Sequence, residues 1–221
     1  MSESAAERAY RAIRDGILDG THEPGSMLGE ESLAQAIGVS RTPVRTALSR
    51  LQQEGWITVY PKRGAQVVGL DDRAVADLAA ARLLLETNGV RQASSTARTS
   101  LADRLFPLVT GQRDAFAHHD LREFVELTIA FHRGFVEVGG NSVLLELYDR
   151  LADRHRFLLF ASSGRLLSHC SDVIREHERL VESLRSDDLD TFVDVLTGHM
   201  SELPPAPDDA FTRLALRQEH P

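Results

Sequence analysis

Three histidines in the second half of the chain combine a residue type and positions that suit a metal ion. His132, His177 and His199 each stand beside apolar residues, on the inward side of three separate helical patterns. Neutral imidazoles bind zinc and related divalent ions, and helical bundles build such sites from side chains on facing helices. Their wide spacing has little specificity, unlike a compact His-Glu-x-x-His motif, so structural histidines remain an open alternative.

Arg82 is a second candidate because it falls inside the apolar run of residues 78–85. A buried guanidinium needs an anionic partner, and Glu86, one helical turn later, is the candidate within the chain. Two interpretations carry equal weight. Arg82 and Glu86 form a structural pair or subunit contact, or Arg82 faces the cavity of a helical bundle and binds a ligand carboxylate.

The remaining histidines and the single cysteine are expected to have no special chemistry. We assign six histidines to the surface or to helix ends: His22, His118, His119, His155, His169 and His220. His155 differs from the other five in that it lies in the middle of a helical pattern, between Arg154 and Arg156. Cys170 cannot form an internal disulfide, which suits a reducing compartment, and is expected to be a small buried or half-buried side chain.

Between positions 32 and 53 the N-terminal part contains no acidic residue, and its charged side chains there are all arginines. Its outward polar side chains include Arg41, Thr42, Arg45, Thr46 and Arg50. Arginine is the side chain best shaped to bind phosphates and guanine edges through two hydrogen bonds. Two further cations, Lys62 and Arg63, precede Gly64 in a turn. These residues predict contacts with double-stranded DNA.

The elements that would position these cations form a winged helix. An apolar helical pattern reaches Gly38, which fits a helix C-terminal turn, and Ser40 suits the N-cap of a second helix. The apolar positions of that helix are Val44, Ala47, Leu48 and Leu51. Residues 56–60 and 65–68 predict two strands, and the turn at 61–64 would place its cations against phosphate or in the minor groove. Helix, turn, helix and wing together predict a DNA-binding unit.

The second part of the chain is predicted to be entirely helical, which makes the fold class mainly α. The first part of the chain contains one further helix, expected at about 6–18, before the helix-turn-helix. In the second part, about six helices are expected at 71–97, 100–118, 120–138, 142–163, 168–186 and 188–202, with breaks at 139–141, Gly164 and Asp187. The predicted organisation is a winged helix over residues 1–69, a helical bundle over 70–203 and a tail over 204–221.

Composition supports this division. The 221 residues are 42% hydrophobic and 26% charged, with a net charge of −8. Residues 1–69 carry eight basic and eight acidic side chains, so the excess acidity belongs to the second part. A local basic face matters more for phosphate contact than the charge of the whole chain. No apolar run reaches the roughly 18 residues of a membrane span, and the start does not resemble a secretion signal. We therefore expect a cytoplasmic protein with no membrane partner.

An ordered set of residues resembles the GntR family of bacterial transcription regulators, in its FadR-type branch with an all-helical effector-binding (FCD) domain. Over residues 8–69 the resemblance rests on Ile17-Leu18-Asp19-Gly20, Pro24-Gly25, Leu33-Ala34, Val39-Ser40-Arg41-Thr42-Pro43-Val44-Arg45, Ala47-Leu48, Leu51, Glu54-Gly55 and Arg63-Gly64. Over residues 71–202 it rests on Arg82 with Glu86, Phe131-His132, Gly140-Asn141, Glu176-His177, Asp188 and His199.

This resemblance implies a homodimer that binds a palindromic DNA operator, and a small effector, often a carboxylate, within the helical bundle. It implies a ligand-responsive regulator, most often a repressor, and not an enzyme. The residues it assigns to the effector are Arg82, Thr128, His132, His177 and His199, and the three histidines are its ligands for a divalent metal such as zinc, nickel or manganese.

The chain departs from the family pattern at two of these positions. Thr128 stands where metal-binding relatives have an aspartate one turn before the first histidine. A neutral hydroxyl is a poor ligand for a divalent ion, so water or an effector carboxylate would have to complete the metal's coordination. Glu31 stands where many relatives have an arginine that approaches DNA. Since Glu31 would repel phosphate, we expect an altered operator or weaker binding.

Two other functions remain as alternatives. A metal-dependent enzyme with an accessory DNA-binding domain would need an open metal position and a nearby general base. The sequence contains no His-Glu-x-x-His, Gly-x-Ser-x-Gly or P-loop motif. A constitutive DNA-binding protein whose helical part only dimerises would bind no effector.

Overall fold

The structure of the protein is a computed structural model that describes residues 3–201. The chain forms two compact units, the first ending at Leu70 and the second beginning at Asp71. Among the described residues, no helix is both long enough and apolar enough to cross a bilayer. The fold is mainly helical with one small sheet, which confirms the predicted fold class.

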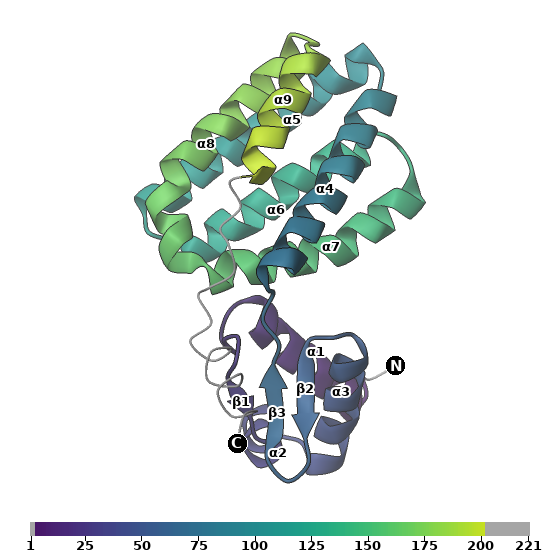
Figure 1. Cartoon of the computed structure of the whole chain (residues 1–221), viewed down its shortest axis with the longest axis vertical. Coiled ribbons are helices and arrows are strands. Elements are labelled where there is room, and N and C mark those ends of the chain that lie inside the picture. The colour runs from purple at the N-terminus through teal and green to yellow at the C-terminus, as the bar shows by residue number, and fades with distance from the viewer. Residues whose placement is uncertain (1–2, 202–221) are drawn as a thin grey trace, which may run out of the picture. The chain divides into compact units, whose positions relative to one another are not determined.

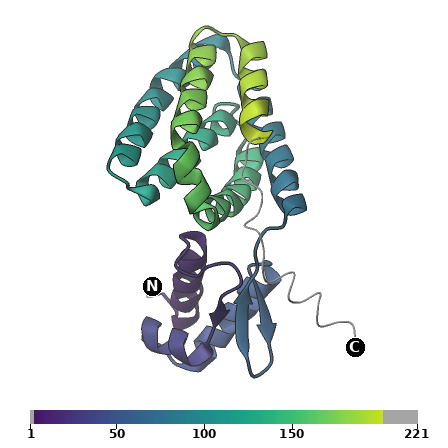
Figure 2. The ribbon, with the colours of Figure 1, turned by 60° about the vertical axis from the view of Figure 1, so that its left-hand side comes forward.

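The first unit is a winged helix. Its elements, in chain order, are α1 (Ala5–Leu18), β1 (Met27–Leu28), α2 (Glu30–Ile37), α3 (Arg41–Gln53), β2 (Ile57–Tyr60) and β3 (Gly64–Val67). The sheet is antiparallel in the order β1-β3-β2, and β2 and β3 run side by side as the wing (Figures 1 and 2). The sequence did not predict β1, because two residues are too short to show an alternating pattern.

The turn between α2 and α3 sets how α3 is presented. Gly38 adopts the left-handed conformation with φ of 72°, and its N–H donates to the carbonyl of Ala34. Ser40 occupies the N-cap of α3, but its side chain makes no capping hydrogen bond. The predicted apolar stripe is buried, and it consists of Val44, Ala47, Leu48 and Leu51. The opposite side of α3 therefore faces outward.

The second unit is a bundle of helices around one apolar core (Figure 1). Over its described residues, 71–201, the helices are α4 (Asp72–Gln92), α5 (Ser95–Ala117), α6 (Leu121–Glu137), α7 (Ser142–Ala161), α8 (Ser163–Arg185) and α9 (Leu189–Ser201). Asp71 caps α4, since its side chain accepts a hydrogen bond of 2.7 Å from the N–H of Ala74. The helical character expected for this part of the chain is confirmed.

Two predicted breaks between consecutive helices of the bundle are misplaced, so that α5 and α8 each begin five residues before the predicted starts at 100 and 168. The helix expected at 71–97 ends at Gln92, because Ser94 caps α5 and Arg98 donates to the freed carbonyls of Val90 and Ala93. The break expected at Gly164 is instead the single residue Ser162, so Gly164 lies within α8. The predicted tail at 204–221 lies outside the described residues.

Gly89 fixes how closely α4 approaches α6. A Cβ atom at Gly89 would lie 2.1 Å from the carbonyl oxygen of Phe135 and 2.8 Å from the Cα of Val136. Both are backbone atoms of α6, so only glycine allows this contact. Glu86 lies one turn before Gly89 on α4, and His132 lies one turn before Phe135 on α6. The close crossing thus brings these two side chains together.

Candidate metal centre and nucleic-acid interface

The structure brings together the three histidines that the sequence singled out. His132 on α6, His177 on α8 and His199 on α9 offer nitrogens that all lie within 4.8 Å of one another. The Nε2 atoms of His132 and His199 are 3.1 Å apart. His132 and His177 are fully buried, and the side chain of His199 is 9% exposed. Three helices therefore supply one compact imidazole cluster.

The other ring nitrogen of each histidine faces an oxygen. The partners of the Nδ1 atoms are Glu86 Oε2 at 2.8 Å from His132, Gln112 Oε1 at 2.7 Å from His177, and Glu176 Oε2 at 2.6 Å from His199. When each Nδ1–H donates to its oxygen, each Nε2 presents a lone pair toward the centre of the cluster. Partners of this kind orient histidine ligands around metal ions.

The chemistry of this donor set fits a divalent ion. Nitrogen ligands about 2.0–2.1 Å from zinc lie about 3.3 Å apart in a tetrahedral site, close to the 3.1 Å between His132 and His199. The buried Nε2 of His177 has no hydrogen-bond partner. Burial, aided by neighbouring positive charge, holds the pKa of His132 and of His177 well below the usual value, so both imidazoles are neutral. Neutral imidazoles are the form that binds metal.

Thr128 adds little to this donor set. It lies one turn before His132 on α6 and is buried, so the structure places it beside the cluster. However, its hydroxyl donates to the carbonyl of Phe124 at 2.9 Å. The proton of this side chain is therefore used within the helix, and a neutral oxygen binds a divalent ion only weakly.

Arg82 lies next to the cluster and is fully buried. Its Nε donates to Glu86 Oε1 at 3.1 Å, so the pair expected from the sequence is present. Burial raises the pKa of Glu86 to about 7, against the opposing effect of the Arg82 charge. The Nη1 and Nη2 atoms of Arg82 are buried without hydrogen-bond partners. The guanidinium thus forms a structural pair on one side and keeps unused donors on the other.

The expectation that His155 is a surface residue is wrong. It is 2% exposed, and its ring centroid lies 5.9 Å from that of His132. It shares the inner face of α7 with Tyr148, seven residues earlier, which is fully buried. The flanking arginines concealed this spacing, although apolar positions at Ala152 and Leu159 complete the same helical face. Of the other surface assignments, His118, His119 and His169 are exposed, His22 is half-buried, and His220 lies outside the described residues.

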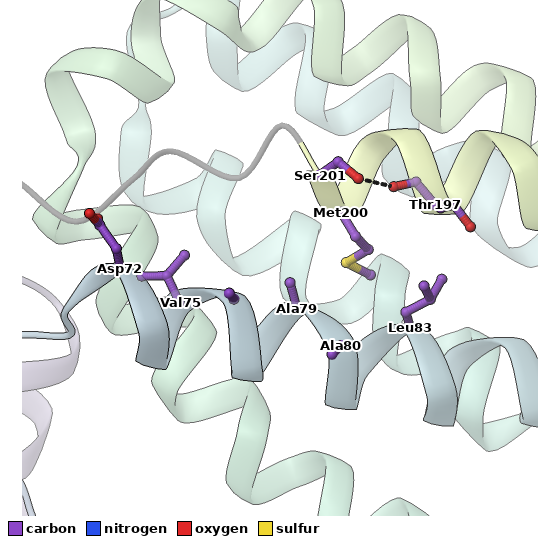
Figure 3. Close-up of a pocket in the computed structure, with 9 residues that line it drawn as sticks. Asp72, Val75, Ala79, Ala80, Leu83, Thr197, Met200 and Ser201 are labelled. Carbon is purple, nitrogen blue, oxygen red and sulfur yellow. Dashed lines mark hydrogen bonds between the residues drawn. The ribbon is translucent and has the colours of Figure 1, made fainter.

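A groove of about 510 Å³ lies elsewhere in the bundle, between α4 and α9 (Figure 3). Its lining is mostly apolar and consists of Asp72, Val75, Ala76, Ala79, Ala80, Leu83, Thr197, Met200 and Ser201. None of the candidate ligand residues lines this groove. The groove and the buried polar cluster are therefore separate features of the bundle.

The predicted DNA-contacting side chains of α3 all lie on its outer face. Arg41, Thr42, Arg45, Thr46 and Arg50 are exposed. At the wing, Lys62 and Arg63 are exposed in the turn between β2 and β3. Gly64 has a structural role, since its φ is 111° and a Cβ there would lie 2.5 Å from the carbonyl oxygen of Leu28. The structure thus presents one helix face and one wing tip with cations.

Acidic side chains accompany these arginines. Glu30 Oε2 accepts from Arg45 Nε at 2.7 Å and from Arg41 Nη2 at 3.1 Å. Glu31 Oε2 lies 3.6 Å from Arg41 Nη1. Arg50 pairs with two other carboxylates, those of Glu7 and Glu54. The carboxylates occupy positions at the guanidinium groups that a phosphate could take.

Comparison with known proteins agrees with both units. Residues 5–67 match the family described as bacterial regulatory proteins, gntR family, and residues 77–202 match the FCD domain. The chain is 26% identical over 200 residues to the HTH-type transcriptional repressor RspR of Escherichia coli K12, covering 89% of this chain and 86% of that protein.

Two further relatives extend this comparison. An uncharacterised regulator from an unstable DNA locus of Streptomyces ambofaciens is 36% identical over 138 residues, which is 60% of this chain and about half, 55%, of that relative. The crystal structure of a GntR transcriptional regulator from Rhodococcus sp. RHA1 has the same fold, with a TM-score of 0.76 at 19% identity, covering 90% of this chain and 95% of that one. The chain therefore belongs to the GntR family of bacterial transcription regulators, and consists of a DNA-binding winged helix followed by an FCD domain.

Proposed function

We propose that the protein is a homodimeric repressor that binds a palindromic operator, and that a small organic acid changes its affinity for this operator. The observation that carries the effector half of this proposal is that three imidazoles lie together beside a fully buried arginine whose Nη atoms have no hydrogen-bond partner. Buried polar groups without partners lower stability, so such a cluster is expected where a ligand pairs with them.

The DNA half of the proposal rests on the exposed cations of the winged helix. Arg41 and Arg45 supply phosphate and base-edge contacts from α3, with Thr42 and Thr46 beside them. Arg50 adds a phosphate contact, and the exposed wing cations supply others. A homodimer would place two such units on half-sites related by two-fold symmetry, which makes the operator palindromic.

A divalent ion such as zinc, nickel or manganese would be held by His132, His177 and His199. When bound, it supplies positive charge that attracts an anionic oxygen of the effector. Glu86 and the other Nδ1 partners keep the imidazole rings oriented for this task. Because Thr128 provides no carboxylate, water or an oxygen of the effector would have to complete the metal's coordination, and in the second case metal binding and effector binding would strengthen each other.

Effector binding controls DNA binding only to the extent that the acid prefers one of the protein's two states. Such preferences are typically about 1–3 kcal/mol between coupled sites. Arg82 contributes to the preference because its buried charge is compensated by Glu86 alone until a carboxylate arrives.

The Arg45→Ala variant tests the recognition surface. We expect it to abolish operator binding in a gel-shift assay at fixed salt, while circular dichroism and gel filtration remain those of the wild type. Arg104→Ala, on an exposed position of α5, is the matched control and should bind normally. Retained operator affinity in the Arg45 variant would contradict the assignment of α3.

The metal half is tested by elemental analysis of the protein after incubation with zinc or nickel. We expect up to one bound ion per chain in the wild type and none in a His132→Ala/His177→Ala variant. A wild-type protein that retains no metal under these conditions would contradict the metal-assisted part of the proposal.

A further inference from the structure

One side chain of α3 bonds to the backbone of the wing. Gln52 is the second-last residue of α3, and its Oε1 accepts a hydrogen bond of 3.0 Å from the N–H of Val59 on β2. Gln52 is exposed and uncharged, and neither the family resemblance nor the proposed DNA contacts give it a role. It directly links the two elements of the winged helix that present cations.

This hydrogen bond lies on the outer edge of the sheet. The strand order β1-β3-β2 makes β2 an edge strand. Val59 lies opposite Ala65 of β3, but its N–H donates to α3 instead. An antiparallel edge strand presents N–H groups of this kind to solvent unless another group covers them. Gln52 therefore takes the place that a further strand would occupy.

The core supports only the beginning of β2. Ile57 is buried, whereas Thr58, Val59 and Tyr60 are exposed. The apolar packing of the strand thus ends before the chain reaches the wing turn. On its inner side β2 pairs with β3 along its whole length. The bond to Gln52 is a fixed point on the outer side, close to the turn.

The connection between α3 and β2 is itself rigid. The N–H of Gly55 donates to the carbonyl of Gln52 at 3.0 Å. The N–H of Trp56 donates to the carbonyl of Leu51, also at 3.0 Å. These two bonds, with Gly55 in the left-handed conformation at a φ of 79°, form a Schellman turn. Both the backbone and the side chain of Gln52 are therefore held.

The wing turn is also well defined. The N–H of Arg63 donates to the carbonyl of Tyr60 at 3.1 Å. Pro61 fixes a negative φ at the second position of the turn, and Lys62 has a φ of 64° at the third. This combination is a type II turn. The backbone of Lys62 and Arg63 therefore has a fixed relation to Val59, and through Gln52 to α3.

We propose that Gln52 is a positioning residue that sets the wing at a fixed angle to α3, so that α3 and the wing cations contact one operator half-site together. This inference rests on the proposed DNA contacts of Lys62 and Arg63 and deepens them. A wing that is fixed before binding loses less conformational freedom when it meets phosphate, so its contacts add more to affinity. Without the link, part of that freedom would be lost on binding.

The Gln52→Met variant of the full-length protein tests this inference. Methionine is similar in length and helix propensity, but its sulfur is only a weak acceptor for the Val59 N–H. We expect affinity for an operator selected from random-sequence DNA to fall by about fivefold or more at fixed salt. The salt dependence of binding should also become shallower, because each lost phosphate contact lowers the slope by about 0.9. A general loss of stability would not change this slope.

The Lys62→Ala/Arg63→Ala variant is the reference for a wing without cations. It should itself bind the operator about fivefold or more weakly, with a shallower salt dependence. Adding Gln52→Met to this variant should change affinity by less than about twofold, because Gln52 acts through the wing cations. Gln53→Met, at the next exposed position of α3, is the matched control and should bind like the wild type.

Three outcomes would count against these assignments. A Gln52→Met protein with wild-type affinity and salt dependence, beside a weakened Lys62→Ala/Arg63→Ala variant, would overturn the inference alone. An equal loss of affinity from Gln52→Met with and without the wing cations would also overturn it, since Gln52 would then act on DNA or on the fold directly. A Lys62→Ala/Arg63→Ala protein that binds like the wild type would contradict the proposed wing contacts, and this inference with them.

Discussion

Glu30 on α2 pairs with two of the α3 arginines that we propose contact DNA. Glu30 bonds to both Arg41 and Arg45, and its hydrogen bond with Arg45 is the largest cause of its lowered pKa. A phosphate that approaches either arginine must displace this carboxylate. The contacts made with an operator offset the free energy lost with these ion pairs. The weaker contacts made with random DNA offset less of it. We therefore expect Glu30 to favour specific over non-specific binding.

Replacing Glu30 by glutamine should raise affinity for non-operator DNA. Because the pairs are exposed, the expected increase is modest, about two- to fivefold. Fluorescence anisotropy with random-sequence duplexes over a series of salt concentrations measures both the affinity and its salt dependence, which should steepen. Glu23→Gln, in an exposed turn of the same unit, serves as the control. If non-operator affinity stays at the wild-type value, Glu30 has no such effect.

At the scale of elements, the crossing of α4 and α6 at Gly89 holds the buried site together. Gly89→Ala would press a methyl group against the backbone of α6, where no flexible side chain can yield. Forced overpacking of this kind destabilises proteins by about 1–3 kcal/mol. We expect a lower melting temperature and weaker zinc binding, because separation of the helices moves Glu86 away from His132.

Gly164→Ala provides the matched control for that variant. Gly164 lies within α8, and a Cβ atom there would meet nothing within 4 Å. This substitution should leave zinc binding unchanged and should raise stability slightly, by up to about 1 kcal/mol, through helix propensity. A Gly89→Ala protein that melts and binds zinc like this control would contradict the role given to the crossing.

The turn between α8 and α9 is fastened to α5 by an ion pair that titrates. Arg98 Nε donates to Asp187 Oδ1 at 2.5 Å, and this bond lowers the Asp187 pKa. A carboxylate with a lowered pKa in the folded state stabilises the fold above its unfolded pKa, about 4, and the stabilisation is lost as the pH falls through the folded value.

Asp187→Asn should therefore reduce stability at pH 7, and the difference from wild type should shrink as the pH falls below about 4. Asparagine tolerates the left-handed conformation of this position, where φ is 58°. Urea denaturation between pH 7 and pH 3 measures the effect, with Asp194→Asn on the exposed side of α9 as the control. A difference that stays constant over this range would rule out the ion pair as its cause.

Local signals explain which elements could be predicted from the sequence. The winged helix was predictable because Gly38, the apolar stripe of α3 and the wing turn each act over a few residues. The break after Gln92 was missed because it depends on Arg98, a residue of the next helix that binds the freed carbonyls. The corner at Ser162 occupies one non-helical residue, which leaves no pattern to detect.

Within the buried site, too, residues with a local sequence signal could be predicted, whereas those whose role depends on distant helices could not. His132, Arg82 and their companions were visible because polar residues stood among apolar neighbours. Gln112 and Tyr148 were not, because glutamine and tyrosine are ordinary residues of helix faces and their role depends on distant helices. His155 was misassigned because its charged neighbours suggested solvent, although helical spacing from Tyr148 points inward.

At the scale of the whole molecule, the chain joins a unit with balanced charge to an acidic one. The cations that we propose contact DNA are gathered on α3 and the wing, and a local basic face matters more for phosphate contact than the net charge of −8. We propose that the buried cluster of the second unit binds the effector. Regulation then requires that an acid bound at this cluster changes the free energy of operator binding.

The central claim is tested most directly by measuring operator affinity with and without acid. Full-length, zinc-loaded protein is titrated onto an operator selected from random-sequence DNA, at fixed salt, in the presence of each member of a panel of small organic acids. We predict that at least one acid changes the dissociation constant by about 5- to 150-fold, and that Arg82→Met abolishes this response but keeps the acid-free affinity. An operator affinity that is the same with and without each acid would contradict the account and leave a constitutive DNA-binding protein.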